Sequence, residues 1–380
     1  MASALSNKAL VVIHLNGGND CLNTFVPYTN GLYYDFRPTI KIDPENFLPV
    51  NDTLGFHPSM GPIKRLWDDG NVAVVNGIGY PRPDRSHFRS LDIWHTAEPE
   101  KIGREGWLGR AIRDLDPQGD NVLTGINFGR GLPRALGCPG VPVASVGNLE
   151  TYGLFPELQE DRARQMALET FARMYGNTAG KDIAKGILGQ TASYALKGAD
   201  VLRTAPEQYT STVTYAENPI ATNLKSMAQV LCADLGTRIC YTQYGSYDTH
   251  SGELATHAKL WNDVAGAVGS FMDDLREHGC EDDVVMLIFS EFGRRIRDNG
   301  SGTDHGSGGV AFVIGNAVQG GMYGAYPSLK VEDQLEGDLH FNNDFRRTYS
   351  TLLEQWLGLE AAPIVNGQFE QFAYLTPTAA

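Results

Sequence analysis

Short apolar runs recur along the chain, and most of them end in glycine or polar residues. The runs are rich in branched residues and do not alternate between apolar and polar positions. They lie at 9–15, 71–77, 237–242, 284–289 and 310–315. Such runs are typical of strands that are buried on both faces of a parallel sheet. We therefore expect a strand at each of them.

Stretches with helical periodicity separate these strands. Residues 57–69 place Met60, Ile63, Leu66 and Trp67 on one face, and further helices are expected from near Ser86, at 253–277 and at 345–356. Alternating strands and helices predict an α/β fold with a mostly parallel central sheet and helices on both faces. We expect one domain over 1–380, with a mainly helical insertion or cap around 156–235.

Composition narrows the function classes. The 380 residues are 42% hydrophobic, which is ample for a large core, and the formal net charge is −14. Phosphate backbones select basic surfaces, so we expect no nucleic-acid partner, although a local anion site is compatible with this charge. No apolar run reaches roughly 18 residues, so no membrane span is expected. Five cysteines without a Cys-x-x-Cys pair favour neither a disulfide framework nor a structural zinc site.

Polar clusters follow four of the predicted strands, where the working residues of open α/β sheets usually lie. They contain Asp20, Ser86-His87, Asp248-Thr249-His250 and Glu291, and Asp304-His305 follows the last of them. Carboxylates and imidazoles together suit zinc, manganese or iron ions. The sequence therefore predicts a metal site at the strand ends.

Ser86 is the candidate nucleophile beside these groups. A serine at a helix N-terminus suits attack on an anionic ester, because free backbone N–H groups there favour negatively charged oxygens. Arg85, Arg294 and Arg295 are candidates for holding a phosphate or sulfate. Simpler interpretations stay open: Ser86 as a helix N-cap, His87 as a packing residue, and the carboxylates in turns or ion pairs.

Five motifs together resemble the DUF1501 family, near the sulfatase-like members of the alkaline phosphatase superfamily. They are Asn16-Gly17-Gly18-Asn19-Asp20, Arg85-Ser86-His87-Phe88, Tyr247-Asp248-Thr249-His250, Ser290-Glu291-Phe292-Gly293-Arg294-Arg295 and Thr303-Asp304-His305-Gly306. The resemblance covers nearly the whole chain. It implies an alkaline-phosphatase-like three-layer sandwich that holds one or two divalent ions, namely Zn, Mn, Fe, Ca or Mg.

The resemblance also implies individual roles. Ser86 falls near the usual nucleophile, with Arg85, His87 and Arg294 as further catalytic candidates. The implied metal ligands are Asp20, Asp248, His250 or His257, Glu291, Asp304 and His305. One departure is Phe292, which stands where the superfamily signature has a histidine. A second ion would then need Asp304, Asn19 or water, or a single ion binds. Cys21 lacks the Cys-x-Pro/Ala-x-Arg pattern that formylglycine formation requires.

These features favour a metal-dependent hydrolase of phosphate or sulfate esters that uses a serine nucleophile or a metal-bound hydroxide. Its substrate would be an anionic small molecule or glycan ester. The alternative is a non-catalytic binding or assembly protein on a decayed hydrolase scaffold. A Ser-His-Asp esterase is disfavoured, because no Gly-x-Ser-x-Gly elbow surrounds Ser86. Export with a twin-arginine leader that this chain does not show, a cytoplasmic location, and any oligomeric state stay open.

Overall fold

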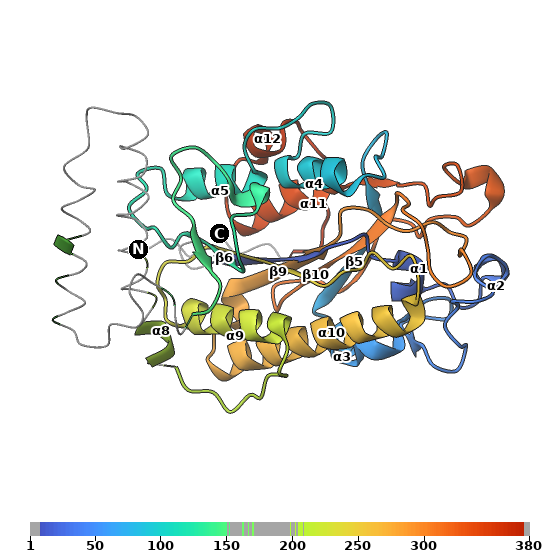
Figure 1. Ribbon diagram of the computed structural model, residues 1–380, viewed down its shortest axis with the longest axis horizontal. Helices are drawn as coiled ribbons and strands as arrows, with labels where there is room; N and C mark the ends of the chain where they lie inside the picture. The colour runs from blue at the N-terminus through green and yellow to red at the C-terminus, as the bar shows by residue number, and fades with distance from the viewer. Residues whose placement is uncertain are drawn as a thin grey trace.

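A nine-stranded sheet forms the centre of the fold (Figure 1). The computed structural model describes residues 8–149, 152, 162, 166, 169–170, 198, 202, 204–207 and 209–375. The strands, in spatial order, are β11 Gly321–Tyr323, β5 Val72–Gly79, β10 Gly309–Ile314, β9 Val284–Phe289, β1 Ala9–Leu15, β8 Ile239–Tyr244, β6 Gly125–Phe128 and β7 Ala144–Val146, and β12 Asn343–Asp344 also pairs with β5.

All neighbouring strands are parallel except at β10, which runs antiparallel to both β9 and β5. No helix lies between β9 and β10. The chain therefore turns back at the edge where β9 ends, and β10 begins there. This reversal brings residues 290–308 to the carboxyl ends of β1, β5, β8 and β9, so all five polar motifs lie at one edge of the sheet.

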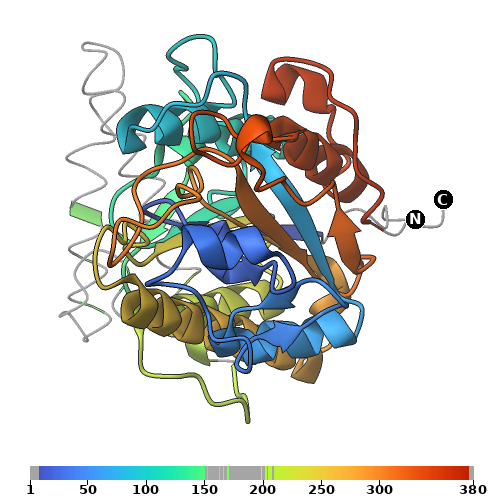
Figure 2. The ribbon, with the colours of Figure 1, turned by 90° about the vertical axis from the view of Figure 1, so that its right-hand side faces the viewer.

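Helices cover both faces of the sheet (Figures 1 and 2). One face carries α4 His87–Thr96, α5 Trp107–Leu115, α11 Phe345–Thr351 and α12 Ala361–Val365, and the other carries α3 Gly61–Asp68, α9 Pro219–Cys232 and α10 Glu253–Glu277. Alternate residues of β1 enter different cores, Leu10 and Val12 on the first face and Val11 and Ile13 on the second. The predicted three-layer α/β architecture is confirmed.

The helices predicted from the periodicity of apolar residues agree closely with those of the structure. The helix expected at 253–277 has these bounds, and the last helix begins as α11 and continues as a π-helix over Leu352–Trp356. Residues 57–69 form η1 Pro58–Met60 followed by α3. Shorter elements are α1 Cys21–Thr24, α8 Thr204–Glu207, η2 Arg134–Leu136, η3 Glu281–Asp283 and η4 Val331–Asp333.

Residues 28–56 are rich in Pro, Gly, Asn and Asp, a composition that predicts a loop, yet the structure has a short helix and short strands there. These residues contain α2 Gly31–Phe36, and β3 Leu48–Pro49 and β4 Gly55–Phe56 join β2 Phe25–Val26 in a small antiparallel sheet. Asn30 explains the helix, because its side chain accepts a hydrogen bond from the Leu32 N–H and so caps the first turn. These elements are too short to give a periodic pattern, and proline and glycine residues are typical of loops, so the sequence did not predict them.

Most of the predicted insertion at 156–235 lies outside the described residues, so the insertion stays a prediction. Its last part is α9, which packs beside α10 under the sheet and so belongs to a layer of the main fold. Among the described residues, no helix is long and apolar enough to cross a membrane.

Gly17 sets the distance between two of the loops that carry polar motifs. It has φ +120°, and a Cβ atom there would overlap the backbone nitrogens of Asp248 and Tyr247. Tyr247 N–H also donates to the Asn16 carbonyl at 2.7 Å. The loop after β1 therefore fixes the position of the loop after β8 by direct backbone contact.

We predict that Gly17→Ala lowers the free energy of unfolding by about 2–4 kcal/mol, because the backbone at Asp248 must move. Urea denaturation followed by circular dichroism measures this change. Gly31→Ala is the matched control, because a Cβ there meets no atom within 4 Å. It should change stability by no more than about 0.5 kcal/mol. Equal effects of the two substitutions would contradict the argument from contact.

Candidate metal centre

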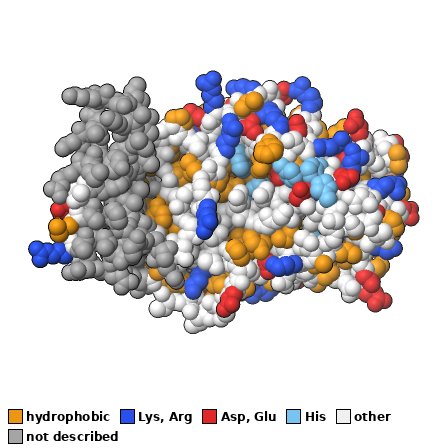
Figure 3. All heavy atoms as spheres, viewed as in Figure 1, with side chains coloured by type: hydrophobic (Ala, Val, Ile, Leu, Met, Phe, Trp, Pro, Cys, Tyr) orange, Lys and Arg blue, Asp and Glu red, His pale blue; other side chains and the backbone are white. Residues whose placement is uncertain are grey.

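Three histidines surround the Asp248 carboxylate at the carboxyl edge of the sheet. The Nε2 atoms of His305 and His250 lie 3.0 and 3.1 Å from Asp248 Oδ1, and the His87 Nε2 lies 3.5 Å from Oδ2. The Nε2 atoms of His250 and His305 are 3.0 Å apart. Figure 3 shows exposed histidine side chains beside acidic ones on one face of the molecule. All four side chains are partly exposed, so a small molecule can reach the group from solvent.

The other ring nitrogen of each histidine faces an oxygen. The Nδ1 of His87 lies 2.8 Å from Glu291 Oε1, that of His250 lies 3.1 Å from Asp304 Oδ1, and that of His305 lies 2.7 Å from the Arg85 carbonyl. Burial alone would raise the pKa of Glu291. Its hydrogen bonds to His14 and His87 outweigh burial and hold this pKa below its usual range. The bond to His250 lowers the pKa of Asp304. These oxygens therefore accept, and each Nδ1 donates.

This arrangement leaves three Nε2 atoms directed at one carboxylate. Within the described residues the His87 Nε2 is buried and has no hydrogen-bond partner. Protonating all three rings would crowd three positive charges beside the Arg294 guanidinium, which already donates to Asp248 Oδ1 at 2.6 Å. His87, Asp248 and His305 each offer one ligand atom within 4.8 Å of the other two, so these three side chains could share a cation, with His250 beside them. Imidazole nitrogens whose second nitrogen donates to an oxygen are the usual ligands of zinc and similar ions.

Arg294 shapes the electrostatics of this centre. Burial would raise the pKa of Asp248, but chiefly the hydrogen bond from Arg294 lowers it to about 2. Asp248 is therefore a carboxylate at neutral pH and can bind a cation. The His87 pKa is raised, chiefly by its hydrogen bond to Glu291.

Phe292 forms an apolar wall behind two of the histidines. Its ring centre lies 4.9 Å from those of His87 and His305. Its ring also fills the space where Gly18, at φ +79°, has no side chain. The residue that departs from the superfamily signature thus orients ligands by packing.

Glu291 contacts two histidines and the loop after β1. Its buried carboxylate accepts from the Gly17 N–H at 2.9 Å, and it faces both the His87 Nδ1 and the His14 Nε2, the latter at 3.0 Å. It therefore stands behind His87 and orients this imidazole. Asp304 has the same relation to His250. Neither carboxylate is directed at Asp248, so the structure gives both a supporting position.

Asp20 and His257 belong to a separate buried group. Both carboxylate oxygens of Asp20 accept from Arg37, with Nη2 and Oδ1 2.9 Å apart. Burial raises the pKa of Asp20, but Arg37 lowers it to about 2. Burial and the charge of Asp20 raise the pKa of neighbouring Glu253 to about 9. Burial lowers the pKa of His257 to about 3. The structure does not bring this group to the Asp248 carboxylate.

The catalytic candidates are distributed around the centre. Ser86 occupies the N-cap position of α4, but its hydroxyl makes no capping hydrogen bond, and the side chain is exposed. The Arg85 side chain donates to the buried Asp338 at 2.9 Å while its carbonyl holds His305. Arg294 is fully buried and its donors go to Asp248 and to the carbonyls of Gly17, Gly18, Tyr247 and Thr303. It is therefore not placed to hold a substrate.

Two residues of the site were missed from sequence. His14 lies within the predicted strand at 9–15 and was not among the candidates, yet its side chain supports Glu291. A histidine inside an apolar strand was the signal, because a buried imidazole needs a partner. Arg37 was also missed, and no local pattern distinguished it from a surface arginine.

The fold and site define a three-layer α/β protein with a candidate His₃Asp metal centre at the carboxyl edge of its sheet. The chain belongs to the DUF1501 family, described as "Protein of unknown function (DUF1501)", whose model matches residues 7–355. The family predicted from the five motifs is therefore confirmed. No curated protein matches the chain.

Several solved structures are similar to this chain at low sequence identity. The phosphonate monoester hydrolase of Agrobacterium radiobacter is 12% identical, with 96% of this chain and 78% of that chain covered and a TM-score of 0.42. An alkaline phosphatase superfamily protein from Vibrio parahaemolyticus is 10% identical, with 85% and 64% covered and a TM-score of 0.39. The lipoteichoic acid synthase LtaP from Listeria monocytogenes is 10% identical, with 82% and 66% covered and a TM-score of 0.39. Similarities this low assign no activity to this chain.

We predict that Asp20→Ala lowers the free energy of unfolding by about 3–5 kcal/mol, because it leaves the Arg37 guanidinium buried without its partner. Metal content per folded chain should stay at the wild-type value, because Asp20 is not directed at the centre. Denaturant unfolding and elemental analysis measure the two quantities. The exposed Asp35 provides the control variant, Asp35→Ala. Lost metal with unchanged stability would instead make Asp20 a ligand.

Proposed function

We propose that this protein is a metal-dependent hydrolase of phosphate or sulfate esters with one divalent ion. The observation that carries the proposal is the convergence of three imidazole Nε2 atoms on the ionised Asp248. The ligands are His87, Asp248, His250 and His305. A divalent ion held there would polarise an ester oxygen and stabilise the charge that develops during attack.

A single ion is favoured because the remaining candidate ligands are already engaged. Glu291 is bound between His87 and His14, and Asp20 is neutralised by Arg37. The guanidinium thus provides the positive charge that a second ion would have brought to Asp20. We propose that the superfamily's second cation site is occupied in this chain by an arginine.

Ser86 is the proposed nucleophile. The residues on either side of it belong to the centre, because the Arg85 carbonyl holds His305 and His87 is itself a proposed ligand. Its hydroxyl makes no capping bond, so it is free to turn toward a substrate. The free N–H groups of the first turn of α4 would stabilise a negative charge on the ester.

An anionic substrate is favoured by the arginines on this edge. The side chains of Arg85 and Arg295 are each 37% exposed and lie 2.9 and 3.8 Å from the Asp338 carboxylate, and Arg85 also lies 3.6 Å from Glu336 Oε2. Each guanidinium is paired but partly exposed, so it could still donate to a phosphate or sulfate from solvent. The exposed Phe88, beside His87, offers an apolar surface for the alcohol part of an ester.

We predict that the purified wild-type protein contains about one equivalent of divalent metal, and that His305→Ala or His250→Ala contains under about a tenth. The loss follows from removing one of four ligands. Elemental analysis of protein prepared without chelator measures it. His340→Ala is the control, because this exposed histidine bonds only to the neighbouring Phe341 carbonyl. Two equivalents in the wild type would contradict the single-ion centre.

We predict that Ser86→Ala keeps its metal but loses at least about 1,000-fold in kcat/KM, because the nucleophile is absent. Hydrolysis of para-nitrophenyl phosphate and para-nitrophenyl sulfate measures turnover, and para-nitrophenyl acetate tests for a neutral-ester esterase. Ser328→Ala is a control on an exposed serine. Full activity in Ser86→Ala would assign attack to water. A metal-loaded wild type that hydrolyses no anionic ester would favour the binding or assembly alternative.

A further inference from the structure

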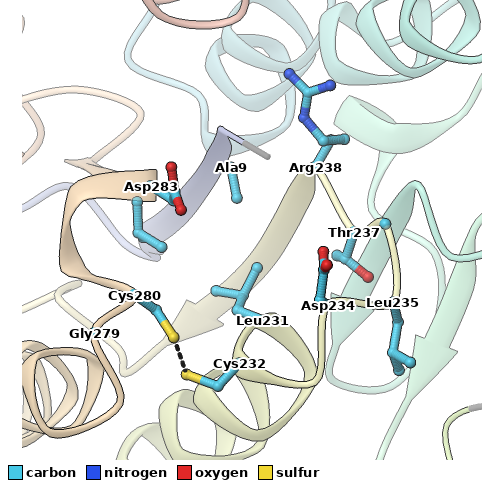
Figure 4. Close-up of a pocket in the computed structure, with 12 residues that line it drawn as sticks. Ala9, Leu231, Cys232, Asp234, Leu235, Thr237, Arg238, Gly279, Cys280 and Asp283 are labelled. Atoms are coloured by element: carbon cyan, nitrogen blue, oxygen red, sulfur yellow. Dashed lines mark hydrogen bonds between the residues drawn. The ribbon is translucent and has the colours of Figure 1, made fainter. Parts of the chain in front are cut away.

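Two cysteines from distant parts of the chain lie next to each other. The Sγ atoms of Cys232 and Cys280 are 2.8 Å apart although 48 positions separate the residues (Figure 4). Cys232 is the last residue of α9, and Cys280 lies in the turn after α10. The pair therefore connects the ends of two helices that pack side by side.

Backbone hydrogen bonds hold both cysteines in place. The Cys280 N–H donates to the Leu275 carbonyl at 2.8 Å, and Gly279 ends α10 at φ +66°. On the other helix, the Ala233 N–H donates to the Gln229 carbonyl at 3.2 Å. Both side chains thus project from fixed helix ends. The sulfurs need to approach by less than about 1 Å to reach bonding distance.

A reagent from solvent can reach the pair. Both sulfurs line a cavity of about 200 Å³, together with Asp234, Arg238 and Asp283 (Figure 4). Cys232 and Cys280 are half-buried, whereas Cys21 and Cys240 are buried in the cores. The cavity lies at the amino ends of β1, β8 and β9, because Ala9, Arg238 and Val284 line it. This is the opposite edge of the sheet from the candidate metal centre.

The two thiols differ in acidity. The hydrogen bond between them lowers the pKa of Cys280 and raises that of Cys232, which burial raises further. Cys280 is therefore the thiol that more readily becomes the attacking thiolate.

We propose that Cys232 and Cys280 form a disulfide by exchange with a small-molecule disulfide such as oxidised glutathione. The Cys280 thiolate attacks one sulfur of the reagent and releases the first glutathione thiolate. Cys232 then gives up its proton, attacks the Cys280 sulfur of the mixed disulfide and releases the second. The two protein thiols lose two electrons and two protons, and the reagent is reduced to two thiols.

This disulfide adds a feature that the cysteine count did not indicate. The odd number is explained by one pair and three separate thiols, Cys21, Cys138 and Cys240. The cross-link would join the end of α9 to the turn after α10 and close a long loop. Closing such a loop restricts the unfolded chain, so the oxidised protein should melt about 3–5 °C higher.

The test incubates the full-length protein with oxidised glutathione and compares it with protein kept in dithiothreitol. Intact mass should fall by two hydrogens, and unreduced peptide mapping should join Cys232 to Cys280. Cys138→Ser should give the same link. Cys232→Ser should instead stop at one glutathione on Cys280 and show no rise in melting temperature on oxidation.

Several results would overturn the proposal. Two glutathione adducts on the wild type, full alkylation of both thiols after oxidation, or a link to another cysteine would each do so. The peptide map of the wild type decides the matter even where Cys232→Ser folds poorly. Metal content and ester turnover report on the candidate metal centre at the other edge of the sheet. Their outcome is therefore independent of whether this disulfide forms.

Discussion

The buried guanidinium of Arg294 is the interaction on which the candidate site depends. It belongs to the loop after β9 and donates to the carbonyls of Gly17 and Gly18 after β1, Tyr247 after β8, and Thr303 before β10. Three loops, those after β1 and β8 and the one between β9 and β10, are thereby fixed relative to one another by one side chain. Its remaining contact, to Asp248, holds the carboxylate on which the histidines converge. A buried arginine is stable there because carbonyls and a carboxylate compensate its charge.

The balance of buried charge explains why the centre is smaller than the motifs suggested. Each buried carboxylate near the strand ends has its own positive or donating partner, Arg37 for Asp20 and two histidines for Glu291. A carboxylate satisfied in this way gains little from binding an ion, because it would first have to give up those contacts. Asp248 differs, since the Nε2 atoms of three histidines surround it in addition to Arg294. Among the described residues, Asp248 with His87 and His305 forms the group that could hold a metal ion.

The sequence predicted the fold well because strand and helix signals are local. The buried strands and the α10 bounds follow from apolar periodicity within a few turns of chain. The motifs also predicted which loops would meet, because strand ends share an edge. The sequence did not predict the direction of individual side chains. Glu291 and Asp248 both follow a strand, yet one faces inward to His14 and the other faces the three histidines. That difference comes from long-range partners, which periodicity does not reveal.

The reversal at β10 connects these points. A strand that continued the parallel pattern would require a crossover helix, and residues 290–308 would then leave the carboxyl edge. Because β10 starts where β9 ends, His305 and Glu291 reach His87 from opposite sides. His87 is thereby held at one nitrogen by a carboxylate and directed by the other toward Asp248. The arrangement of the candidate centre thus follows from the direction in which one strand enters the sheet.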